Sequence, residues 1–441
     1  MAGRRQWPAI SPTVFHLRET LEAKIRACQR RQNAHTKAMP PDFAQLYAHY
    51  QTVAPSEIFT WPAQAHGMGD SLDAYVRNHL PAAELEALAS HLRQIQVLGV
   101  YPAHAQAVLP SGRFAVLPFV AKPPRNHNWA RPEFFLSFDR QVLAVCVPPG
   151  RDYLKHYTSL LRYFLDRFLP GRGIDLEARF YPGAALTLAH WTGLDELALP
   201  PGSTVLLGHI DEFLKAVDSP RAPVALCPIR LNAYFDLCRL DLPRRRSSKE
   251  CLYVLGFSFS YWGEMAGSVG RALYEAGANE LIYLSKVGSL DPALDLYGDL
   301  IIPERFMLAE HDRVLRPPFG VSNGLLDWAR ATGQVAAAGS LHLSTPTVLE
   351  QSHLQRQVLA PFAPRTVDDE ITHLAAAAER AGGSARFSSL CFATDYVRDA
   401  ADAGLPVVFD LSNNRSPAAR ARRDEALARA ARLLDGYLTQ R

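Results

Sequence analysis

Apolar residues in the first part of the chain recur at spacings of three and four. TVFHLRETLEAKIRACQRRQ and AAELEALASHLRQI carry this period between residues 12 and 91, which predicts helices. From Val97 the period changes, and VLGVYPA, RFAVLPFVA and EFFLSFDRQVLAVCVPP have the short apolar runs typical of strands. A helical period returns in YLKHYTSLLRYFLDRFL. These patterns predict an α+β unit.

A proline- and glycine-rich join, LALPPGS, separates this unit from a second pattern. Beyond it, strand-like runs such as TVLLG, CLYVLGFSFS, ELIYLSKVG and DLIIPERFML alternate with helical runs such as MAGSVGRALYEAG and NGLLDWARATG. Alternation of this kind predicts an α/β fold, with a mostly parallel sheet and helices on both faces. We therefore predict an N-terminal α+β domain of residues 1–198 and an α/β domain of residues 199–441, with the boundary near Leu199.

Carboxylates stand at both ends of one helix-strand unit within residues 366–399. Asp368, Asp369 and Glu370 precede an alanine-rich run and are expected to form the first turn of a helix, where negative charge offsets the exposed backbone N–H groups. Residues 388–393 predict a buried strand, and Asp395 follows its carboxyl end. Because open α/β sheets bind ligands at that end of their strands, Asp395 is a candidate site residue.

Glu370 and Asp395 have the chemistry needed to break an N-glycosidic bond. The sugar gains cationic character as the bond breaks, so a carboxylate bound to its hydroxyls stabilises it. The base leaves more readily when a second carboxyl group gives it a proton. Two acids alone are weak evidence for this reaction, and the sequence around them determines how strongly it is supported.

The second half of the chain resembles the nucleoside phosphorylase and nucleosidase superfamily. The likeness lies in Asp369-Glu370 where members carry Met-Glu, in Thr394-Asp395 after the next strand, and in ELIYLSKVGSLDP, which maps Lys286, Gly288 and Ser289. The resemblance implies a nucleoside phosphorylase-like mixed sheet flanked by helices.

The first half is similar to the N-terminal domain of AMP nucleosidases. The shared residues are Tyr101-Pro102, Gly112-Arg113-Phe114 and Arg131-Pro132, with His190, Thr192-Gly193 and Asp211-Glu212-Phe213 around the join. This likeness implies hydrolysis of a purine nucleoside 5′-monophosphate to free base and ribose 5-phosphate. Asp395 would protonate the base and Glu370 would hold the ribose hydroxyls. Lys286, Ser289, Arg113 and Arg131 would meet the phosphate through charge-assisted hydrogen bonds.

The glycine-rich turn of the superfamily is altered in this chain. In GFSFSYWGE, Gly256 and Gly263 remain, but four aromatic residues crowd the turn, of which Trp262 either stacks on a base or belongs to the core. Asp369 adds a charge beside the sugar site. LLGHIDEFLK lacks the arginine that phosphorylases carry there, which favours attack by water. A nucleoside phosphorylase and a non-catalytic nucleotide-binding protein of the same fold remain the alternatives.

Composition and charge limit the classes of binding partner that the sequence supports. The 441 residues are 48% hydrophobic and 21% charged with a formal net charge of +3, which gives no general argument for nucleic-acid or membrane binding. The six cysteines have no metal-ligand spacing, so we expect free thiols, no metal and no cofactor. No apolar run approaches the roughly 20 residues of a membrane span. We expect a cytoplasmic protein with a small-molecule ligand, and the resemblance implies a homo-oligomer, specifically a hexamer.

Overall fold

The computed structural model describes the greater part of the chain after residue 70. The described residues are 51–53, 71–100, 105–109, 112–117, 132–180, 188, 192–218, 224–232, 234–242, 251–257, 259–310, 313–333, 337–350, 358–397 and 416–440. Arg131, the helical stretch near residue 20 and the residues Tyr101, Pro102 and His190 lie outside them.

The first unit is built around a six-stranded sheet in the order β1-β6-β2-β5-β4-β3. Its strands are β1 (Gln51–Val53), β2 (Gln94–Gly99), β3 (Phe114–Leu117), β4 (Glu133–Ser137), β5 (Val142–Val147) and β6 (Asp175–Phe180). Its helices are α4 (Ser71–His79), α5 (Ala82–Leu88), α6 (Ala105–Val108) and α7 (Arg151–Phe168). Strand β2 pairs in parallel with β5 and β6, and the outer pairs are antiparallel. The predicted α+β character of this unit is confirmed.

The apolar run EFFLSFDRQVLAVCVPP forms a hairpin of β4 and β5. Its turn is fixed by Asp139, whose Oδ1 accepts from the Ser137 hydroxyl at 2.5 Å and from the Gln141 amide at 3.1 Å. Arg140 adopts a left-handed φ of 60° in this turn. A run with the polar residues Asp139 and Arg140 at its centre thus folds back on itself, because a local side-chain bond closes the turn.

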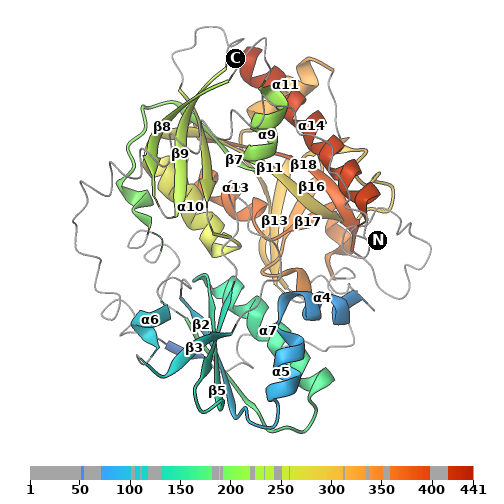
Figure 1. Ribbon diagram of the computed structural model, residues 1–441. Helices are drawn as coiled ribbons and strands as arrows, with labels where there is room; N and C mark the ends of the chain where they lie inside the picture. The colour runs from blue at the N-terminus through green and yellow to red at the C-terminus, as the bar shows by residue number, and fades with distance from the viewer. Residues whose placement is uncertain are drawn as a thin grey trace, which may run out of the picture.

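The inner strands of the six-stranded sheet are covered on both faces within the chain. One face packs against α4, α5 and α7 through a cluster that includes Val97, Phe134, Val145 and Phe164. The other face contributes Leu98, Phe135 and Cys146 to the core of the second unit. The two units are therefore in direct apolar contact, with α7 at their junction (Figure 1).

The second unit contains a twelve-stranded sheet. Its main path runs β14-β13-β16-β17-β11-β7-β10-β9-β8, with β18 beside β11, and β12 joining β18 to β15. The strands are β7 (Ser203–Gly208), β8 (Ala225–Leu231), β9 (Phe235–Asp241), β10 (Leu252–Phe257), β11 (Ala278–Ser289), β12 (Leu300–Ile302), β13 (Arg305–Glu310), β14 (Arg313–Gly320), β15 (Ala337–Ala338), β16 (Leu341–Ser344), β17 (Thr366–Asp368) and β18 (Arg386–Tyr396).

Helices cover both faces of this sheet, as the sequence predicts. Helices α10 (Glu264–Glu275) and α13 (Ile371–Ala381) pack on one face, and α9 (Ile210–Val217), α11 (Gly324–Ala331) and α14 (Pro417–Gln440) on the other. Short 3-10 turns η3 (Leu194–Glu196), η4 (Val348–Glu350) and η5 (Ala360–Phe362) complete the described elements. The predicted α/β class, with a mixed sheet flanked by helices, is confirmed.

The expectation of a mostly parallel sheet is wrong in part. The centre, β10-β7-β11-β18, is parallel, but the hairpins β8-β9 and β13-β14 are antiparallel, as is the contact between β11 and β17. DLIIPERFML is two strands, because Pro303 has no N–H to donate and separates β12 from β13.

The change from one sheet to the other lies between β6 and β7. Leu199 donates its amide to the Ala276 carbonyl at 2.7 Å and packs in the same core as Val205. The domain boundary near Leu199 stays a prediction.

Cysteines and helix lengths complete the picture. Among the described residues Cys146, Cys238 and Cys391 are buried free thiols, whereas Cys227 is exposed. No described helix has the length and apolar character to cross a membrane.

Candidate functional site

Asp368, Asp369 and Glu370 lie between β17 and α13, and we call these three residues the acid loop. Asp368 is the last residue of β17, and α13 begins at Ile371. The expectation that all three acids form the first helical turn is therefore wrong. Thr366 and Val367 pair with β16 and β11, and this pairing extends the backbone as far as Asp368. The sheet thus overrides the local helix signal, and the acids are presented ahead of the helix.

The carboxylate of Asp368 is saturated with hydrogen bonds. Its oxygens accept from the Ile371 amide at 3.0 and 3.1 Å and from the Glu370 amide at 3.1 Å. The Ser344 hydroxyl and His342 Nε2 lie 2.7 and 2.8 Å from Oδ1. His342 Nδ1 lies 2.8 Å from the Thr366 hydroxyl, so a ring with its proton on Nε2 satisfies both partners. Asp368 therefore caps α13 and fixes the acid loop.

Asp369 and Glu370 are carboxyl groups that hold their protons more tightly than usual. Burial raises the pKa of each, and the adjacent charge of Asp368 raises both further. Asp369 is 4% exposed and accepts a 3.2 Å bond from the Thr345 hydroxyl. Glu370 keeps part of its surface exposed. A carboxyl group with a raised pKa can act as a proton donor near neutral pH.

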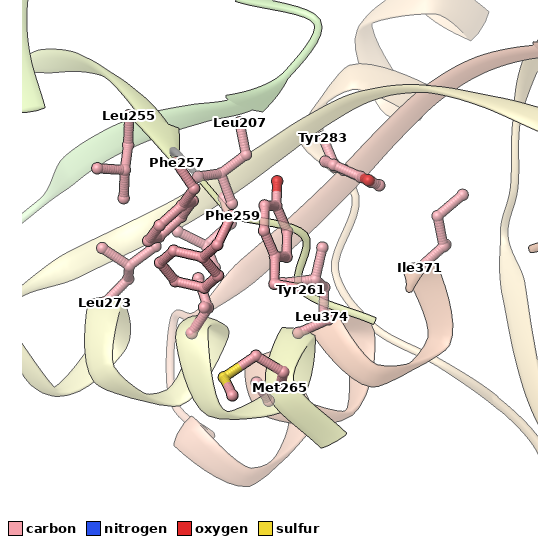
Figure 2. Packing of buried hydrophobic residues seen from close by; sticks show 14 of the residues in the cluster. Leu207, Leu255, Phe257, Phe259, Tyr261, Met265, Leu273, Tyr283, Ile371 and Leu374 are labelled. Carbon is pink, nitrogen blue, oxygen red and sulfur yellow. The ribbon is translucent and has the colours of Figure 1, made fainter. Parts of the chain in front are cut away.

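Two tyrosines stand beside Glu370. Tyr283 comes from the middle of β11 and Tyr261 from the segment after β10, and Figure 2 shows both between Leu207 and Ile371. Burial raises the pKa of each, with the charge of Glu370 as the next cause, so both hydroxyls stay neutral at physiological pH. The two hydroxyls are hydrogen-bonded to each other, and Tyr261 also bonds to the Gly208 backbone, which ties β7 and β11 to the segment after β10.

Gly208 brings the end of β7 against this group. Its φ is +91°, and a Cβ there would lie 2.1 Å from the Leu284 carbonyl oxygen and 3.0 Å from Tyr283 Cε2. Only glycine permits this approach. The carboxyl ends of β7 and β10 and the acid loop consequently meet at one place.

Asp395 lies in the last two residues of β18, not beyond its end. Its Oδ1 accepts from the Thr394 hydroxyl at 2.6 Å, and its Oδ2 is 3.7 Å from the position that a Cβ on Gly288 would take. Gly288 pairs with Asp395 on one side and with Val367 on the other. Two strand spacings of about 4.8 Å therefore separate β18 from β17, which leads into Glu370.

The remaining residues predicted from β10 and β11 have diverse surroundings. The Lys286 side chain is exposed, and its backbone lies opposite Phe392 of β18 in the strand register. Ser289 is 1% exposed, and its hydroxyl donates to the Asp291 carbonyl at 2.7 Å, so it shapes a turn. Gly256 lies inside β10 opposite Asp236.

Trp262 and Arg113 are placed against the first unit. The indole packs on Tyr153 of α7, with ring centroids 4.5 Å apart, and on His156 at 4.9 Å. Arg113 is exposed and lies near Asp139 at the β4-β5 turn. The hydrogen bond from Ser137 is the main cause that lowers the pKa of Asp139, and the charge of Arg113 adds to it. The structure thus brings Asp369 and Glu370 together and places Trp262 and Arg113 in other surroundings.

Sequence reasoning missed several residues around the acid loop: His342, Ser344, Tyr283 and Asp152. Their only signals are a buried-strand pattern in LHLS and LIYLS and a helix start in GRDYLKHY. None of these patterns indicates which other segment lies opposite. Among the described residues no cluster of histidine, cysteine or acidic side chains is suited to hold a metal ion.

Asp369 gives the first prediction, on stability. Its folded pKa is raised, so the stability it contributes is full below the unfolded pKa of about 3.9 and is lost as pH rises through the folded pKa. Asp369→Asn carries no charge and should melt at a higher temperature than wild type at pH 8, with the difference shrinking toward pH 4.

Thermal unfolding of both proteins across this pH range is the measurement. Asp166→Asn, which changes an acid 64% exposed on α7, is the matched control and should show no such trend. Equal melting temperatures of wild type and Asp369→Asn at pH 8 would contradict the prediction that the buried negative charge of Asp369 destabilises the fold.

Comparison with known proteins gives one curated relative and several solved structures. No family model matches the chain. "Oxidoreductase cns1" of Cordyceps militaris is 27% identical over 439 residues, with 92% of this chain and 53% of the relative aligned. The chain thus spans about half the length of that curated relative.

Structural alignment finds nucleosidases at low scores. Futalosine hydrolase of Helicobacter pylori aligns with 54% of this chain and 98% of its own at a TM-score of 0.41 and 13% identity. The 5′-methylthioadenosine/S-adenosylhomocysteine nucleosidase of Helicobacter pylori aligns with 55% of this chain and 99% of its own, at a TM-score of 0.39 and 14% identity. The 5′-methylthioadenosine nucleosidase of Arabidopsis thaliana aligns with 55% of this chain and 95% of its own, at a TM-score of 0.37 and 13% identity.

Proposed function

We propose that the protein is an N-glycosidase that hydrolyses a purine nucleoside 5′-monophosphate to free base and ribose 5-phosphate. The observation that carries this proposal is the place of Glu370, which stands beside Tyr261 from the segment after β10 and beside Tyr283, against which Gly208 at the end of β7 packs. The carboxyl edge of the strands is where α/β sheets bind small ligands.

The proposed reaction needs two acids in different places. Glu370 binds the ribose hydroxyls, whose O–H groups donate to its carboxyl oxygens. Asp395 gives a proton to a ring nitrogen of the base. The C1′–N bond then breaks with its electron pair leaving on the base, and water supplies the oxygen that bonds to C1′. The separation of about 10 Å between the strands suits a ligand that reaches from sugar to base.

The phosphate subsite requires positive charge near the sugar. Lys286 is exposed and carries the positive charge that a phosphate requires, whereas the Ser289 hydroxyl is already used in its turn. Arg113 lies at the β4-β5 hairpin. We therefore assign the 5′-phosphate to Lys286 first, with Ser289, Gly288, Arg113 and Arg131 as the sequence-based candidates around it.

A non-catalytic nucleotide-binding protein is the second candidate. The observation in its favour is the aromatic filling after β10, where Phe257, Phe259 and Tyr261 are 2%, 1% and 7% exposed and pack as core (Figure 2). Side chains that fill the turn leave less room for a ligand. Such a protein would bind a nucleotide without releasing its base.

Assembly as a homo-oligomer, and as a hexamer in particular, is proposed from the resemblance alone. Within the chain, α7 packs on one face of the first sheet and the second unit on the other, whereas Val116 of the edge strand β3 is 58% exposed. A cytoplasmic location is likewise proposed from the sequence.

The test of the proposed function is base release from a panel of nucleosides and nucleoside monophosphates in phosphate-free buffer. We expect free purine from a monophosphate, with ribose 5-phosphate as the second product, because LLGHIDEFLK supplies no arginine for inorganic phosphate. The products are separated by chromatography and identified by mass.

The outcomes separate the candidates. An absolute requirement for phosphate, with a sugar 1-phosphate as product, would identify a phosphorylase. Tight nucleotide binding without base release under any condition would favour the non-catalytic protein.

A further inference from the structure

The first turns of α7 carry polar residues that are buried at the junction of the two units. Asp152, Lys155 and His156 are 4%, 1% and 0% exposed. Residues at spacings of three and four share one face of a helix, so this polar face points away from the apolar stripe that packs on the first sheet. Burial of polar groups is costly unless they have partners. Each of these three residues has a partner in the second unit, and His156 also lies 3.4 Å from the Tyr75 hydroxyl of α4.

Asp152 reaches the start of α10. Its Oδ2 accepts from the Glu264 amide at 3.0 Å, which satisfies one of the free N–H groups at that helix end. The preceding residue, Gly263, has a φ of +54°, and a Cβ on it would lie 1.8 Å from Asp152 Oδ2. Glycine is therefore required at 263 both for the backbone conformation and for the space that the carboxylate fills.

The same turn holds the acid loop. The Gly263 amide donates to the Asp369 carbonyl oxygen at 2.8 Å. Consecutive amides, of Gly263 and Glu264, thus bond to Asp369 and to Asp152. A displacement of Asp152 changes the position of this turn and, through it, the backbone of Asp369.

Helix α7 also binds the other side of the acid loop. Lys155 Nζ lies 2.6 Å from Glu310 Oε1 and pairs with Glu350 of η4, and His156 Nδ1 lies 2.7 Å from the Thr347 hydroxyl. The segment before η4 contacts the loop directly, since the Thr345 amide donates to the Asp368 carbonyl at 2.9 Å. The acid loop is therefore held between two contacts of one helix.

The charges around Asp369 come from three elements. They are Asp368 and Glu370 of its own loop, Asp152 of α7 and Glu350 of η4, the last paired with Lys155. Around Asp152 stand Arg151 of its own helix, Glu264 of α10 and His373 of α13. The charge of Asp152 is among the causes that raise the pKa of Asp369.

We propose that Asp152 of the first unit is a positioning residue of the candidate site, which fixes the place and the protonation of the acid loop through the Gly263 turn. The kinetic part of this proposal rests on the proposed function, whereas the electrostatic part does not. The first unit is then a component of the site and not an independent module.

The electrostatic part is tested without substrate by a double-mutant cycle. Asp152→Asn keeps an oxygen that can accept from the Glu264 amide and removes the charge. Without that like charge the pKa of Asp369 falls, so the loss of melting temperature between pH 5 and pH 8 should be smaller than in wild type. In an Asp369→Asn background the same substitution should change this loss by less than half as much. Asp166→Asn, on the same helix, is the control for an exposed charge.

The kinetic part is tested by the pH profile of base release. Asp369 acts on the reaction through its neighbour Glu370, whose pKa its charge raises. As the pKa of Asp369 falls in Asp152→Asn, we therefore expect the alkaline limb of kcat/KM to move to lower pH. Asp152→Ala, which also loses the bond to α10, should in addition lower kcat. A merely structural role would lower activity equally at all pH values.

The outcomes are distinct from those of the proposed function. An equal effect of Asp152→Asn with and without the Asp369 charge would overturn the proposal, as would an unmoved alkaline limb. If the wild-type protein releases no base, the proposed function fails, and the stability cycle alone then decides whether Asp152 controls the acid loop.

Discussion

Asp395→Asn is expected to slow base release by about 10²–10⁴-fold while leaving ligand affinity nearly unchanged. The amide has the shape of the carboxyl group and retains an oxygen that accepts from the Thr394 hydroxyl, which lies 2.6 Å from Asp395 Oδ1. It cannot supply a proton to a leaving base. Base release is measured by chromatography of the free purine, and affinity by calorimetric titration with the nucleotide.

The matched control is Asp327→Asn, which changes an exposed acid in the first turn of α11. We expect it to retain wild-type rates. A rate for Asp395→Asn within a few fold of wild type would remove Asp395 from the role of proton donor. The acid loop, whose Asp369 and Glu370 have raised pKa, would then be the source of the proton.

Lys155→Met is expected to cost up to about 3–5 kcal/mol of unfolding free energy, because it removes the buried cation that pairs with Glu350 and leaves Glu310 only the half-exposed Arg151 and the exposed Arg313. Lys155 is 1% exposed and pairs with Glu310, itself 3% exposed, and with Glu350. Methionine has a similar volume, so the loss comes from charge and not from a cavity. Denaturant unfolding of both proteins at neutral pH is the measurement.

Lys215→Met, at an exposed position of α9, is the matched control and should change stability by less than about 0.5 kcal/mol. Adding Glu310→Gln and Glu350→Gln to Lys155→Met should recover much of the loss, since the uncompensated charges are then gone. A cost below about 1 kcal/mol for Lys155→Met would show that Arg151, 2.6 Å from Glu310, suffices to neutralise the junction.

Elements whose apolar residues follow a regular period were predictable from the sequence. Helix α7 has the period of an amphipathic helix, and α9 directly follows the apolar strand β7 in TVLLGHIDEFLKAV. In these segments the local pattern and the final packing agree, because one stripe of each helix covers a sheet. The α/β class and the alternation of strand and helix after residue 199 follow from the same patterns.

Elements that depend on a distant partner were not predictable. Strand β9 and hairpin β13-β14 have mixed patterns, and they form because a neighbouring strand accepts their hydrogen bonds. The start of α13 moved from Asp368 to Ile371 for the same reason, since β17 pairs on both sides. Local helix signals are weak compared with such pairing.

In the candidate site, too, some features were predictable from the sequence and others were not. The sequence by itself determined that three acids stand next to a helix and that a fourth stands near the end of the following strand, because side-chain type and order along the chain are local facts. Only the tertiary structure decided that His342 and Ser344 bind Asp368, that Trp262 packs on α7, and that Asp152 reaches α10. These contacts join residues more than 20 positions apart. Their formation depends on how two sheets and a helix pack, which no local pattern specifies.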